Sequence, residues 1–440
     1  MYIKSFQLKE IKAFSDVKFD FGKDDQYAGW NVFVGGNASG KSTILKGIAL
    51  ALAGPVEGRV LLPTTQGWLR YSAASGTIDL ELVFDKEHDT FKGKGATPIG
   101  PFFAGVQWHK PSKEDQLPIF EANKKSRSPL KIAERSLWNT NASGWFCAGY
   151  GPMRRLTGTS ADAIRFTLAG GVISRFLTLF REDAALTESE EWLKKEHARS
   201  LEQGTNSQSA QLLENVTSFL NDGLLPNNMK ISKVTVDQVL LSNQEGLELP
   251  MRDLSDGFRS VYALLLDLIH SFAEVYGVEG LFTKNPDSPW QINKPGVVLI
   301  DEVEAHLHPV WQQTLPEWLK SRFPLVQFIV TTHSPLIVQA ASPGGIYVLP
   351  LQNEPQRAAR RLDDHEYEKI RLGRAEKILL GEAFGLKQTR STWAKKQIDQ
   401  WKRLKAKKEA EVELTTAEKS DFERLERDMQ LVFEFPENQE

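Results

Sequence analysis

The stretch NVFVGGNASGKST, residues 31–43, decides the fold of this chain. Its first four residues predict a short buried strand, and apolar side chains at helical spacing predict a helix over 41–53 that Gly54-Pro55 ends. The residues between them fit the pattern G-x-x-x-x-G-K-[ST], in which glycines let successive backbone N–H groups surround phosphate oxygens. Because a strand precedes the pattern and a helix follows it, it predicts a phosphate-binding loop in an α/β fold.

The residue types in this loop suit a nucleoside triphosphate with Mg²⁺. Lys41 is expected to reach the β- and γ-phosphates, and the Ser42 hydroxyl is expected to be a ligand of the metal ion. A glycine-rich turn that binds nothing is the alternative, and the flanking strand and helix argue against it. The residues of this loop predicted to bind ATP are Gly35, Asn37, Ser39, Gly40, Lys41, Ser42 and Thr43.

A second motif, GVVLIDEVEAHLHP at 296–309, joins a buried strand to two acids. Open α/β sheets bind ligands beyond the carboxyl ends of their strands, so Asp301 is expected to hold Mg²⁺ through water. Glu302 is expected to face the attacking water as the general base. Taken alone, the pair could be a solvated strand end, and the phosphate-binding loop makes the catalytic interpretation the stronger one.

Three histidines accompany this motif in the sequence. His306 and His308 could be metal ligands, but no cysteine or third histidine lies with them, so a turn beside the nucleotide is favoured. His333, in TTHSP at 331–335, ends the strand expected over 326–332. If that strand lies beside the strand of Asp301, His333 could donate a hydrogen bond to a γ-phosphate.

The stretch LSDGFRS, residues 254–260, predicts the start of a helix over 257–276. Ser255 is suited to cap this helix, and Gly257 leaves its backbone uncovered. The first N–H groups of a helix have no intrahelical partner and point outward. The sequence therefore predicts a helix end that attracts an anion from elsewhere.

Together these four motifs resemble those of the ATP-binding-cassette (ABC) ATPases, which combine a phosphate loop, an L-S-x-G signature, an apolar strand ending in Asp-Glu and a switch histidine. The resemblance implies that Ser255 and Gly257 cap the γ-phosphate held by a second subunit. It thereby implies a homodimer, or a higher homo-oligomer, in which two subunits enclose two ATP molecules. It also implies ATP hydrolysis, with Glu302 and His333 as the catalytic residues.

The opening IKSFQLKEIKAFSDVKFDF, together with GxNxSGKS and DEVEAHLHP, is similar to the SMC-like ATPases of DNA maintenance. More narrowly it resembles ATPases related to the overcoming-lysogenization-defect (OLD) family, including ATPase subunits of Septu- and PARIS-type anti-phage systems. This resemblance implies a sensor that controls a separate effector, such as an HNH or Toprim nuclease. A DNA repair or recombination ATPase is the alternative, and a transporter motor fits less well because the signature is altered and no membrane segment is visible.

Nuclease activity in the chain itself is not expected. Only about ninety residues follow IYVLPL, at 346–351, which is too few for an added nuclease domain of ordinary size. The basic segment 395–408 could follow a nucleic-acid backbone. A solvated helix face, with Trp393 and Trp401 buried on its other side, is the favoured interpretation.

The resembled family also carries a glutamine loop near the metal ion, and its place in this sequence stays open. Gln107 is one candidate. The loop 149–155 is another, in which Arg154 or Arg155 could meet phosphate, and a plain surface loop is an equal alternative for both.

Charge, cysteine content and hydropathy argue against a strongly basic nucleic-acid binder, a disulfide-bonded protein and a membrane-spanning protein. Lys and Arg total 54 against 57 Asp and Glu, a net charge of −3, so any nucleic-acid contact must come from a local patch. Cys147 is the only cysteine, which fits a reducing compartment. No apolar run approaches the roughly 20 residues of a membrane-spanning helix. We therefore expect a cytoplasmic protein without membrane contact.

The predicted architecture is an α/β, ABC-type (SMC-like) P-loop ATPase head with an inserted helical region and a helical C-terminal tail. Residues 93–130 are predicted to be irregular, and 160–225 mostly helical. Further strands are predicted at 2–8, 16–22, 77–84, 145–150, 234–242 and 346–351. The predicted domains are an N-terminal lobe at 1–155, a helical insertion at 156–232, a C-terminal lobe at 233–355 and a charged helical region at 356–440.

Overall fold

The protein, seen here as a computed structural model, divides into two compact units. The first is Met1–Ile378 and the second is Leu379–Glu440. The structure describes residues 1–111, 116–123, 131–156, 158–168, 170–224, 229–284, 288–350 and 358–433.

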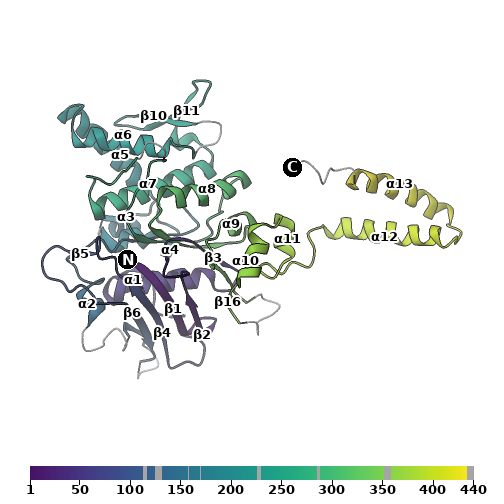
Figure 1. Ribbon diagram of the computed structural model, residues 1–440, viewed down its shortest axis with the longest axis horizontal. Coiled ribbons are helices and arrows are strands. Elements are labelled where there is room, and N and C mark those ends of the chain that lie inside the picture. Colours follow the sequence, from purple (N-terminus) through teal and green to yellow (C-terminus); the bar gives the residue numbers. More distant parts are fainter. Residues whose placement is uncertain are drawn as a thin grey trace. The chain divides into compact units, whose positions relative to one another are not determined.

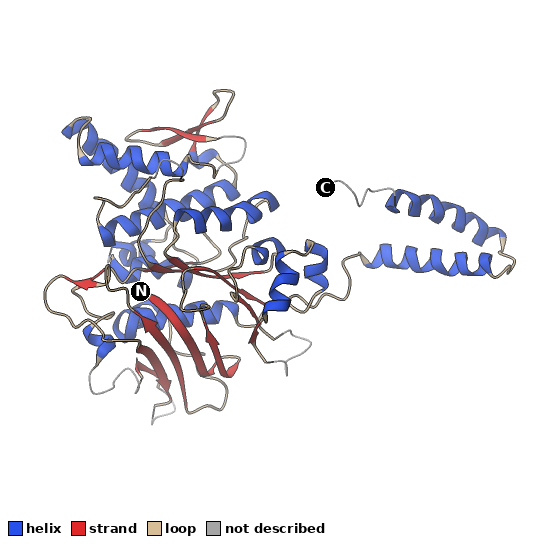
Figure 2. Ribbon diagram, viewed as in Figure 1, coloured by secondary structure: helices blue, strands red, loops and turns tan. Residues whose placement is uncertain are grey.

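A six-stranded sheet forms the centre of the first unit (Figure 2). Its strands are β3 (Gly29–Val34), β9 (Cys147–Tyr150), β13 (Gly296–Ile300), β14 (Val326–Thr332), β15 (Ile346–Val348) and β16 (Arg360–Arg361). They are ordered β16-β15-β3-β14-β13-β9, and all neighbours run parallel except β15 and β16. Every residue of β13 and β14 is buried, as expected for a parallel sheet covered on both faces. The predicted α/β fold is thereby confirmed.

A second, antiparallel sheet lies across helix α1 (Lys41–Leu61) from the first (Figure 1). Its strands are β1 (Tyr2–Ile11), β2 (Phe14–Asp20), β4 (Ser75–Val83), β6 (Phe102–His109) and β7 (Ile119–Ala122). One apolar core joins the two sheets through α1, with Leu8, Ile48, Val106 and Ile329 among its fully buried members. Burial of α1 between two sheets holds the loop before it in place.

The prediction that 93–130 is irregular was wrong for the two strands β6 and β7. Along β6 the buried Phe102, Ala104, Val106 and Trp108 alternate with more exposed neighbours, which is the period of a half-buried strand. Glycine, proline and lysine on both sides of this stretch obscured that period in the sequence. Residues 112–115 and 124–130 lie outside the described part of the chain.

The predicted end of the first helix at Gly54-Pro55 appears as a break inside α1. Gly54 has φ 80° and ψ 179°, and Pro55 begins a second helical segment that continues to Leu61. A Cβ on Gly54 would lie 2.8 Å from the Trp138 ring, and the Trp138 indole N–H donates to the Ala51 carbonyl at 3.1 Å. The glycine therefore allows both the positive φ and the close approach of the indole.

Helices cover the parallel sheet and extend beyond it. They are α3 (Ala161–Leu168), α4 (Gly171–Phe180), α5 (Thr187–Gln203), α6 (Gln208–Leu220), α7 (Asp256–Tyr276), α8 (Pro309–Arg322) and α9 (Pro335–Gln339). Helix α4 packs against β9 and α1, so part of the predicted insertion covers the sheet itself. Helix α5 packs against α6 and α7, and Figure 1 shows α5 and α6 on the side of α7 that faces away from the sheet.

The single strand predicted at 234–242 is two strands of a small sheet. This sheet consists of β10 (Lys230–Val234), β11 (Val239–Ser242) and β12 (Glu248–Pro250). The Thr235 hydroxyl accepts hydrogen bonds from the N–H groups of Asp237 and Gln238, which turns the chain between β10 and β11. Small elements elsewhere are β5 (Thr90–Phe91), β8 (Ala142–Ser143), α2 (Ile132–Arg135) and the 3₁₀ turn Met251–Asp253.

The sequence between 358 and 378 belongs to the first unit, although we assigned it to the C-terminal region. Strand β16 extends the parallel sheet beyond β15, and α10 (Asp364–Arg371) packs against α9. Helix α11 (Ala375–Leu380) follows. Strand β15, at the start of the predicted strand 346–351, therefore lies between β3 and β16, and Leu351 lies outside the described residues.

The second unit is a helical hairpin of α12 (Thr392–Glu409) and α13 (Thr416–Phe433). A small apolar cluster of Leu404, Leu414, Phe422 and Leu425 joins the two helices. None of the helices in the described ranges is both long and apolar enough to span a bilayer.

Candidate nucleotide-binding site

A cavity of about 400 Å³ opens at the phosphate-binding loop of the first unit. Its size lies in the range of pockets that take small ligands. Glu302 follows β13 and His333 follows β14, and both reach the cavity because these parallel strands end at the same edge of the sheet. The lining residues are Lys12, Ala13, Asn37, Ala38, Ser39, Gly40, Lys41, Ser42, Thr43, Glu302 and His333. The structure thus brings three of the four predicted motifs together.

The loop between β3 and α1 has a backbone that few residues could adopt. Ala38 has φ 61° and Gly40 has φ 96°, both left-handed. The Phe14 ring occupies the place of a Cβ on Gly40, which would lie 2.4 Å from it, so this position requires glycine. The Ser39 hydroxyl is buried and makes no hydrogen bond within the described part of the chain. A buried hydroxyl without a partner is costly, and an oxygen-rich ligand in the cavity would satisfy it.

Lys41 is held over this loop by two backbone carbonyls. Its ammonium donates to the oxygens of Gly35 and Gly36, each at 2.9 Å. Burial lowers the pKa of Lys41 from its ordinary value, and the nearby carboxylates of Asp301, Glu302 and Glu304 oppose that shift. The cation therefore lies between the loop and the acids that follow β13.

Thr331 orients the two acids at the end of β13. Its hydroxyl donates to Asp301 Oδ1 at 2.5 Å and accepts from the Glu302 N–H at 2.8 Å. Glu302 has a left-handed φ of 45°, so the chain turns sharply at this residue. As a result Asp301 is buried while the Glu302 side chain lines the cavity.

Glu304 is a site residue that our sequence analysis missed. Its carboxylate accepts one hydrogen bond from the Thr332 hydroxyl at 2.7 Å and another from the His333 N–H. These bonds tie the backbone of His333 to the turn after β13. The sequence showed a third acid near Asp301 and Glu302, but nothing in it indicated which strand this acid would contact.

Arg154 donates hydrogen bonds to the backbone of the turn that follows β13. Its buried guanidinium donates to the carbonyls of Gly151 and Asp301 at 3.0 and 3.1 Å, and to those of Glu302 and Val303 at 3.2 Å each. Burial lowers the pKa of Arg154 to about 10, against the opposing effect of the neighbouring acids. Arg154 is therefore engaged with the backbone of the turn and does not line the cavity.

The other two candidates for the glutamine loop do not reach the cavity either. Arg155 donates to the Glu182 carbonyl at 2.8 Å and is exposed. Gln107 lies on β6 in the antiparallel sheet, where its amide donates to Glu121 at 2.8 Å. Neither residue lines the cavity at the phosphate-binding loop.

Replacement of Arg154 by methionine is expected to destabilise the first unit by about 3 kcal/mol or more. Methionine keeps much of the side-chain volume but leaves buried carbonyls without donors, and each lost charged hydrogen bond costs about 1.5–3 kcal/mol. Thermal unfolding followed by circular dichroism measures the loss. Arg155→Met is the matched control, because it removes one exposed bond and should change the melting temperature by no more than a degree or two. Equal melting temperatures for the two variants would contradict the assigned role of Arg154.

His333 is exposed at the cavity with Lys41 nearby. Partial burial, and then the Lys41 ammonium, lower the pKa of His333 from its ordinary value of 6.5, although Glu304, Glu302 and Asp301 act in the opposite direction. The imidazole is therefore mostly neutral at pH 7.

The fourth motif is placed away from this cavity. Ser255 precedes α7 as its N-cap, but its hydroxyl makes no capping bond to the helix. A Cβ on Gly257 would lie 2.6 Å from the His306 carbonyl, so the signature stretch lies against the turn that follows Glu302. Neither Ser255 nor Gly257 lines the cavity at the phosphate-binding loop.

The His306 and His308 pair agrees with the favoured interpretation as a turn. His308 is the N-cap of α8, where its Nδ1 accepts from the Val310 N–H at 3.4 Å. His306 has a left-handed φ of 65°. Within the described residues, no group of three or more His, Cys, Asp or Glu side chains is arranged to hold a metal ion.

Lys12 is a second lining residue that the sequence analysis did not single out. It lies in the turn between β1 and β2 with φ 48°, and its ammonium lies 4.6 Å from the centre of the Trp68 ring. Burial, and then the Lys46 charge, lower the pKa of Lys12. The turn of the β1–β2 hairpin thus contributes a cation to the cavity.

Comparison with known proteins gives two family matches. Residues 136–339 match the family model described as "AAA domain, putative AbiEii toxin, Type IV TA system", and residues 5–87 match one described as "AAA domain". The two matched segments contain the acids after β13 and the phosphate-binding loop, respectively.

Several curated proteins are similar over part of their length. The Retron Vc95 probable ATPase of Vibrio cholerae serotype O1 biovar El Tor is 33% identical over 143 residues, which is 32% of this chain and 25% of that protein. The Septu protein PtuA of Bacillus mycoides (strain KBAB4) is 25% identical over 372 residues, 81% of this chain and 41% of that protein. PtuA of Bacillus thuringiensis is 32% identical over 171 residues, which is 38% of this chain and 41% of that protein. The match thus spans less than half the length of each of these relatives.

Among solved structures, an Smc head bound to the C-winged helix domain of ScpA aligns with a TM-score of 0.47 at 14% identity, over 83% of this chain and 99% of that chain. Over these stretches the chain is similar to AAA-domain family models, to the probable ATPases of retrons and to the Septu protein PtuA.

Proposed function

We propose that this chain binds and hydrolyses Mg²⁺-ATP, closes into a dimer around the nucleotide, and thereby controls a separate effector in anti-phage defence. The observation that carries the proposal is the single cavity lined by the phosphate-binding loop, Glu302 and His333. A phosphate cradle, a carboxylate base and a hydrogen-bond donor to the γ-phosphate are groups that can support phosphoryl transfer to water.

The residues present fit a triphosphate. The left-handed loop conformation aims backbone N–H groups at one concavity, and the unpartnered Ser39 hydroxyl lies there as well. Lys41 would exchange the Gly35 and Gly36 carbonyls for phosphate oxygens, which interact more strongly with a cation. The N-terminus of α1 adds its dipole to the attraction.

The donors for the metal ion are hard oxygens. Ser42 lines the cavity, and Asp301 lies close enough to Lys41 to influence its pKa. A hydroxyl and a carboxylate are ligands that Mg²⁺ prefers. When bound, the ion would neutralise charge on the β- and γ-phosphates.

Glu302 is the residue placed to accept a proton from water. Its backbone is fixed by Thr331 and Arg154, while its side chain faces the cavity. His333, held through Glu304, would donate a hydrogen bond to the γ-phosphate. Phosphate release from ATP by the purified protein tests this chemistry, and no release above that of a Lys41→Ala blank would contradict it.

ATP binding is expected to be coupled to proton uptake by His333. The pKa of His333 is lowered in the free protein, and a γ-phosphate beside it would favour the imidazolium and raise that pKa. Binding therefore takes up a fraction of a proton between the two pKa values, and none at a pH well above both. Isothermal titration calorimetry in two buffers of different ionisation enthalpy measures the uptake. His333→Gln should remove it, and an unchanged uptake in that variant would exclude His333 as its source.

The proposed dimer rests on Ser255 and Gly257, which lie outside the subunit's own cavity. The hydroxyl of Ser255 makes no capping bond to α7, so this helix end can receive an anion from a second copy. In a Glu302→Gln background, Ser255→Arg should retain ATP on the phosphate-binding loop but lose ATP-dependent dimerisation, measured by light scattering. Ser232→Arg, on the exposed side of β10, is the control. A dimer in both variants would contradict the shared-nucleotide arrangement.

The proposed place in anti-phage defence is supported by the names of the similar proteins, which belong to retrons and Septu systems. A nuclease of HNH or Toprim type is the effector class that our sequence analysis expects. Purification from a native lysate, followed by mass spectrometry, identifies any protein that remains bound. Recovery of the chain alone, in the presence and absence of ATP, would argue against a stable effector complex without affecting the ATPase proposal.

A further inference from the structure

Helix α12 of the second unit has one face that packs against α13 and one face that is exposed. Leu404 is buried against Phe422 and Leu425 of α13, and Trp401 packs on the same cluster. The Gln400 amide donates to Asp421 at 3.1 Å, and Lys407 pairs with Glu418 at 2.6 Å. These contacts identify the side of α12 that faces α13.

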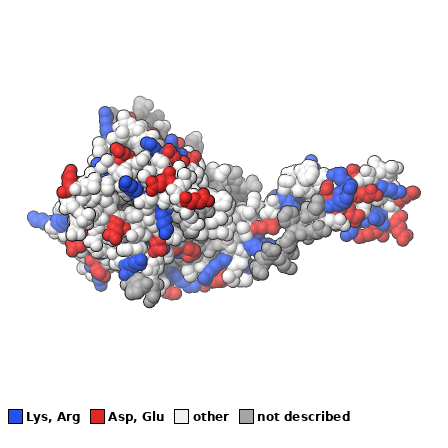
Figure 3. All heavy atoms as spheres, turned by 90° about the horizontal axis from the view of Figure 1, so that it is seen from above, with Lys and Arg blue, Asp and Glu red and all other residues white. Residues whose placement is uncertain are grey.

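The opposite side of α12 is a stripe of cations, which we call the basic face. Its members are Lys395, Lys396, Lys402 and Arg403, all of them exposed. None of the four forms an ion pair with any residue that the structure describes, and Asp399 is the one acid among them. In Figure 3, Lys and Arg atoms gather on the visible surface of this unit, next to a group of Asp and Glu atoms.

The other lysines of α12 behave differently. Lys405 lies 4.9 Å from the centre of the Trp401 ring, and Lys408 lies 4.7 Å from that of Phe422. Lys405 and Lys408 thus contact aromatic rings of the hairpin, whereas the four cations of the basic face are exposed and make no ion pair within the described part of the chain. Like charges at neighbouring helix positions repel, so an anion would stabilise this arrangement.

The spacing of these cations suits a linear polyanion. Two pairs of neighbouring cations lie seven residues apart, which is about 10 Å along a helix. Duplex DNA carries one charge per roughly 1.7 Å, so about six phosphates lie along that length. The chain as a whole has a net charge of −3, so only a local patch of cations could attract such a ligand.

We propose that the basic face of α12 binds the phosphate backbone of a nucleic acid. Trp393 at the start of α12 adds to the proposal, because it is 68% exposed. Our sequence analysis expected Trp393 to be buried with Trp401, and that expectation was wrong for Trp393. It lies three residues before Lys396 and seven before Gln400, at the edge between the basic face and the side that faces α13, where an indole can stack on an unpaired base.

Fluorescence anisotropy with the full chain, with and without ATP, tests this proposal. The probes are a labelled 30-base-pair duplex of arbitrary sequence and its single strand, each titrated at several salt concentrations. The test variant combines Lys395→Ala, Lys396→Ala, Lys402→Ala and Arg403→Ala. Its affinity for both probes should fall at least tenfold at low salt, and the slope of log K against log salt should flatten by about 3 if most of the four cations contact phosphate.

A matched control removes four other exposed lysines, by the changes Lys86→Ala, Lys92→Ala, Lys94→Ala and Lys233→Ala. It changes net charge equally, so it should keep most of the affinity if the basic face is the binding site. Circular dichroism confirms that both variants fold. Trp393→Ala should weaken single-strand binding more than duplex binding, because only unpaired bases can stack on the indole.

Three results would overturn the proposal. The first is wild-type affinity and salt slope in the four-residue basic-face variant. The second is the absence of binding to either probe by the wild-type chain at about 50 mM salt. The third is equal competition by polyglutamate at the same charge concentration, which would indicate an acidic protein as the partner. None of these results depends on the ATPase proposal.

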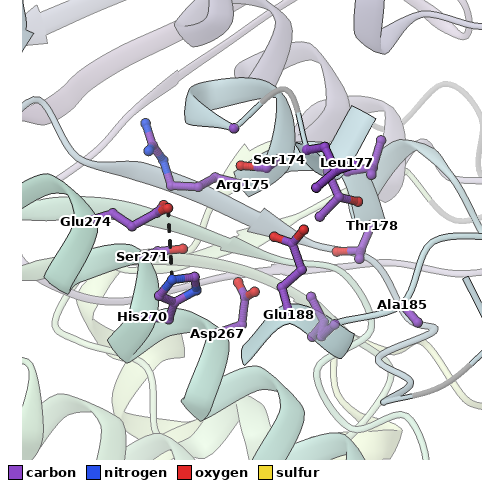
Figure 4. A pocket seen from close by; sticks show the side chains of 14 residues that line it. Ser174, Arg175, Leu177, Thr178, Ala185, Glu188, Asp267, His270, Ser271 and Glu274 are labelled. Atoms are coloured by element: carbon purple, nitrogen blue, oxygen red, sulfur yellow. Dashed lines mark ion pairs between the residues drawn. The ribbon is translucent and has the colours of Figure 1, made fainter. Parts of the chain in front are cut away.

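The cavity of about 240 Å³ between α4, α5 and α7 does not carry a comparable inference (Figure 4). Asp267 and Glu188 both line it, and both have raised pKa values, chiefly from burial. Asp267 is already bonded to Tyr150 at 2.9 Å and Ser189 at 3.1 Å. The buried carboxylate in this cavity is thus already satisfied by partners within the fold, so the cavity does not call for a ligand.

Discussion

Replacement of Lys41 by alanine is expected to weaken ATP binding by at least a hundredfold. In the proposed complex the ammonium donates charged hydrogen bonds to two phosphates, and each such bond contributes about 1.5–3 kcal/mol. Two of them account for about 3 kcal/mol or more, and every 1.4 kcal/mol is a factor of ten. The loss is made worse because Asp301, Glu302 and Glu304 would then face the triphosphate without the cation between them. Equilibrium binding of a fluorescent ATP analogue measures the effect.

Lys46→Ala is the control for this variant. Lys46 lies on the same helix, five residues further on, and does not line the cavity. It should bind ATP within a few fold of the wild type. Thermal unfolding distinguishes lost binding from lost folding, since alanine is well tolerated in a helix and the Gly35 and Gly36 carbonyls lose only one shared donor. Wild-type affinity in Lys41→Ala would remove the loop from the proposed site.

Glu302→Gln is expected to lower ATP turnover by 10²–10⁴-fold, the usual contribution of a positioned general base. Glutamine keeps the shape of the side chain and the Thr331 bond to its backbone, but it cannot accept the proton of the attacking water. ATP binding should remain, so the closed dimer should persist instead of dissociating after hydrolysis. Steady-state phosphate release and light scattering with ATP measure the two effects.

The matched control for this change is Glu317→Gln on the exposed surface of α8, where the carboxylate pairs with Lys320 at 2.8 Å. Its turnover should remain within about twofold of the wild type, because a surface ion pair contributes little. If Glu302→Gln hydrolyses ATP as fast as this control, another group must accept the proton.

The parallel sheet and its site were largely predictable because they rest on local patterns. A short apolar strand, a glycine-rich loop and a helix follow one another within residues 31–53, and each has a characteristic period. The strands that end before Asp301 and His333 could be predicted for the same reason, because each is a short apolar run in the sequence. Parallel strands bring their carboxyl ends to one edge, so Glu302 and His333 meet at the cavity without any further information from the sequence.

The parts that the sequence left open depend on contacts between distant segments. Arg154 and Gln107 had similar standing as candidates, and only packing showed that one clamps the turn after β13 while the other lies in a different sheet. The strand β6 escaped prediction because its turn-forming neighbours hid its period. Trp393 escaped because a helical period shows which residues share a face of α12 but not whether another helix covers that face at each of them.

The sequence by itself determined which groups the candidate site would contain: a glycine-rich loop, two acids at a strand end and a histidine at the next strand end, since each is a local arrangement of backbone and side chain. The tertiary structure alone decided how those groups are held. Glu304, Thr331 and Arg154 act across separations of about 30 to 150 residues, and such pairings follow from the order of strands in the sheet, which no local period encodes.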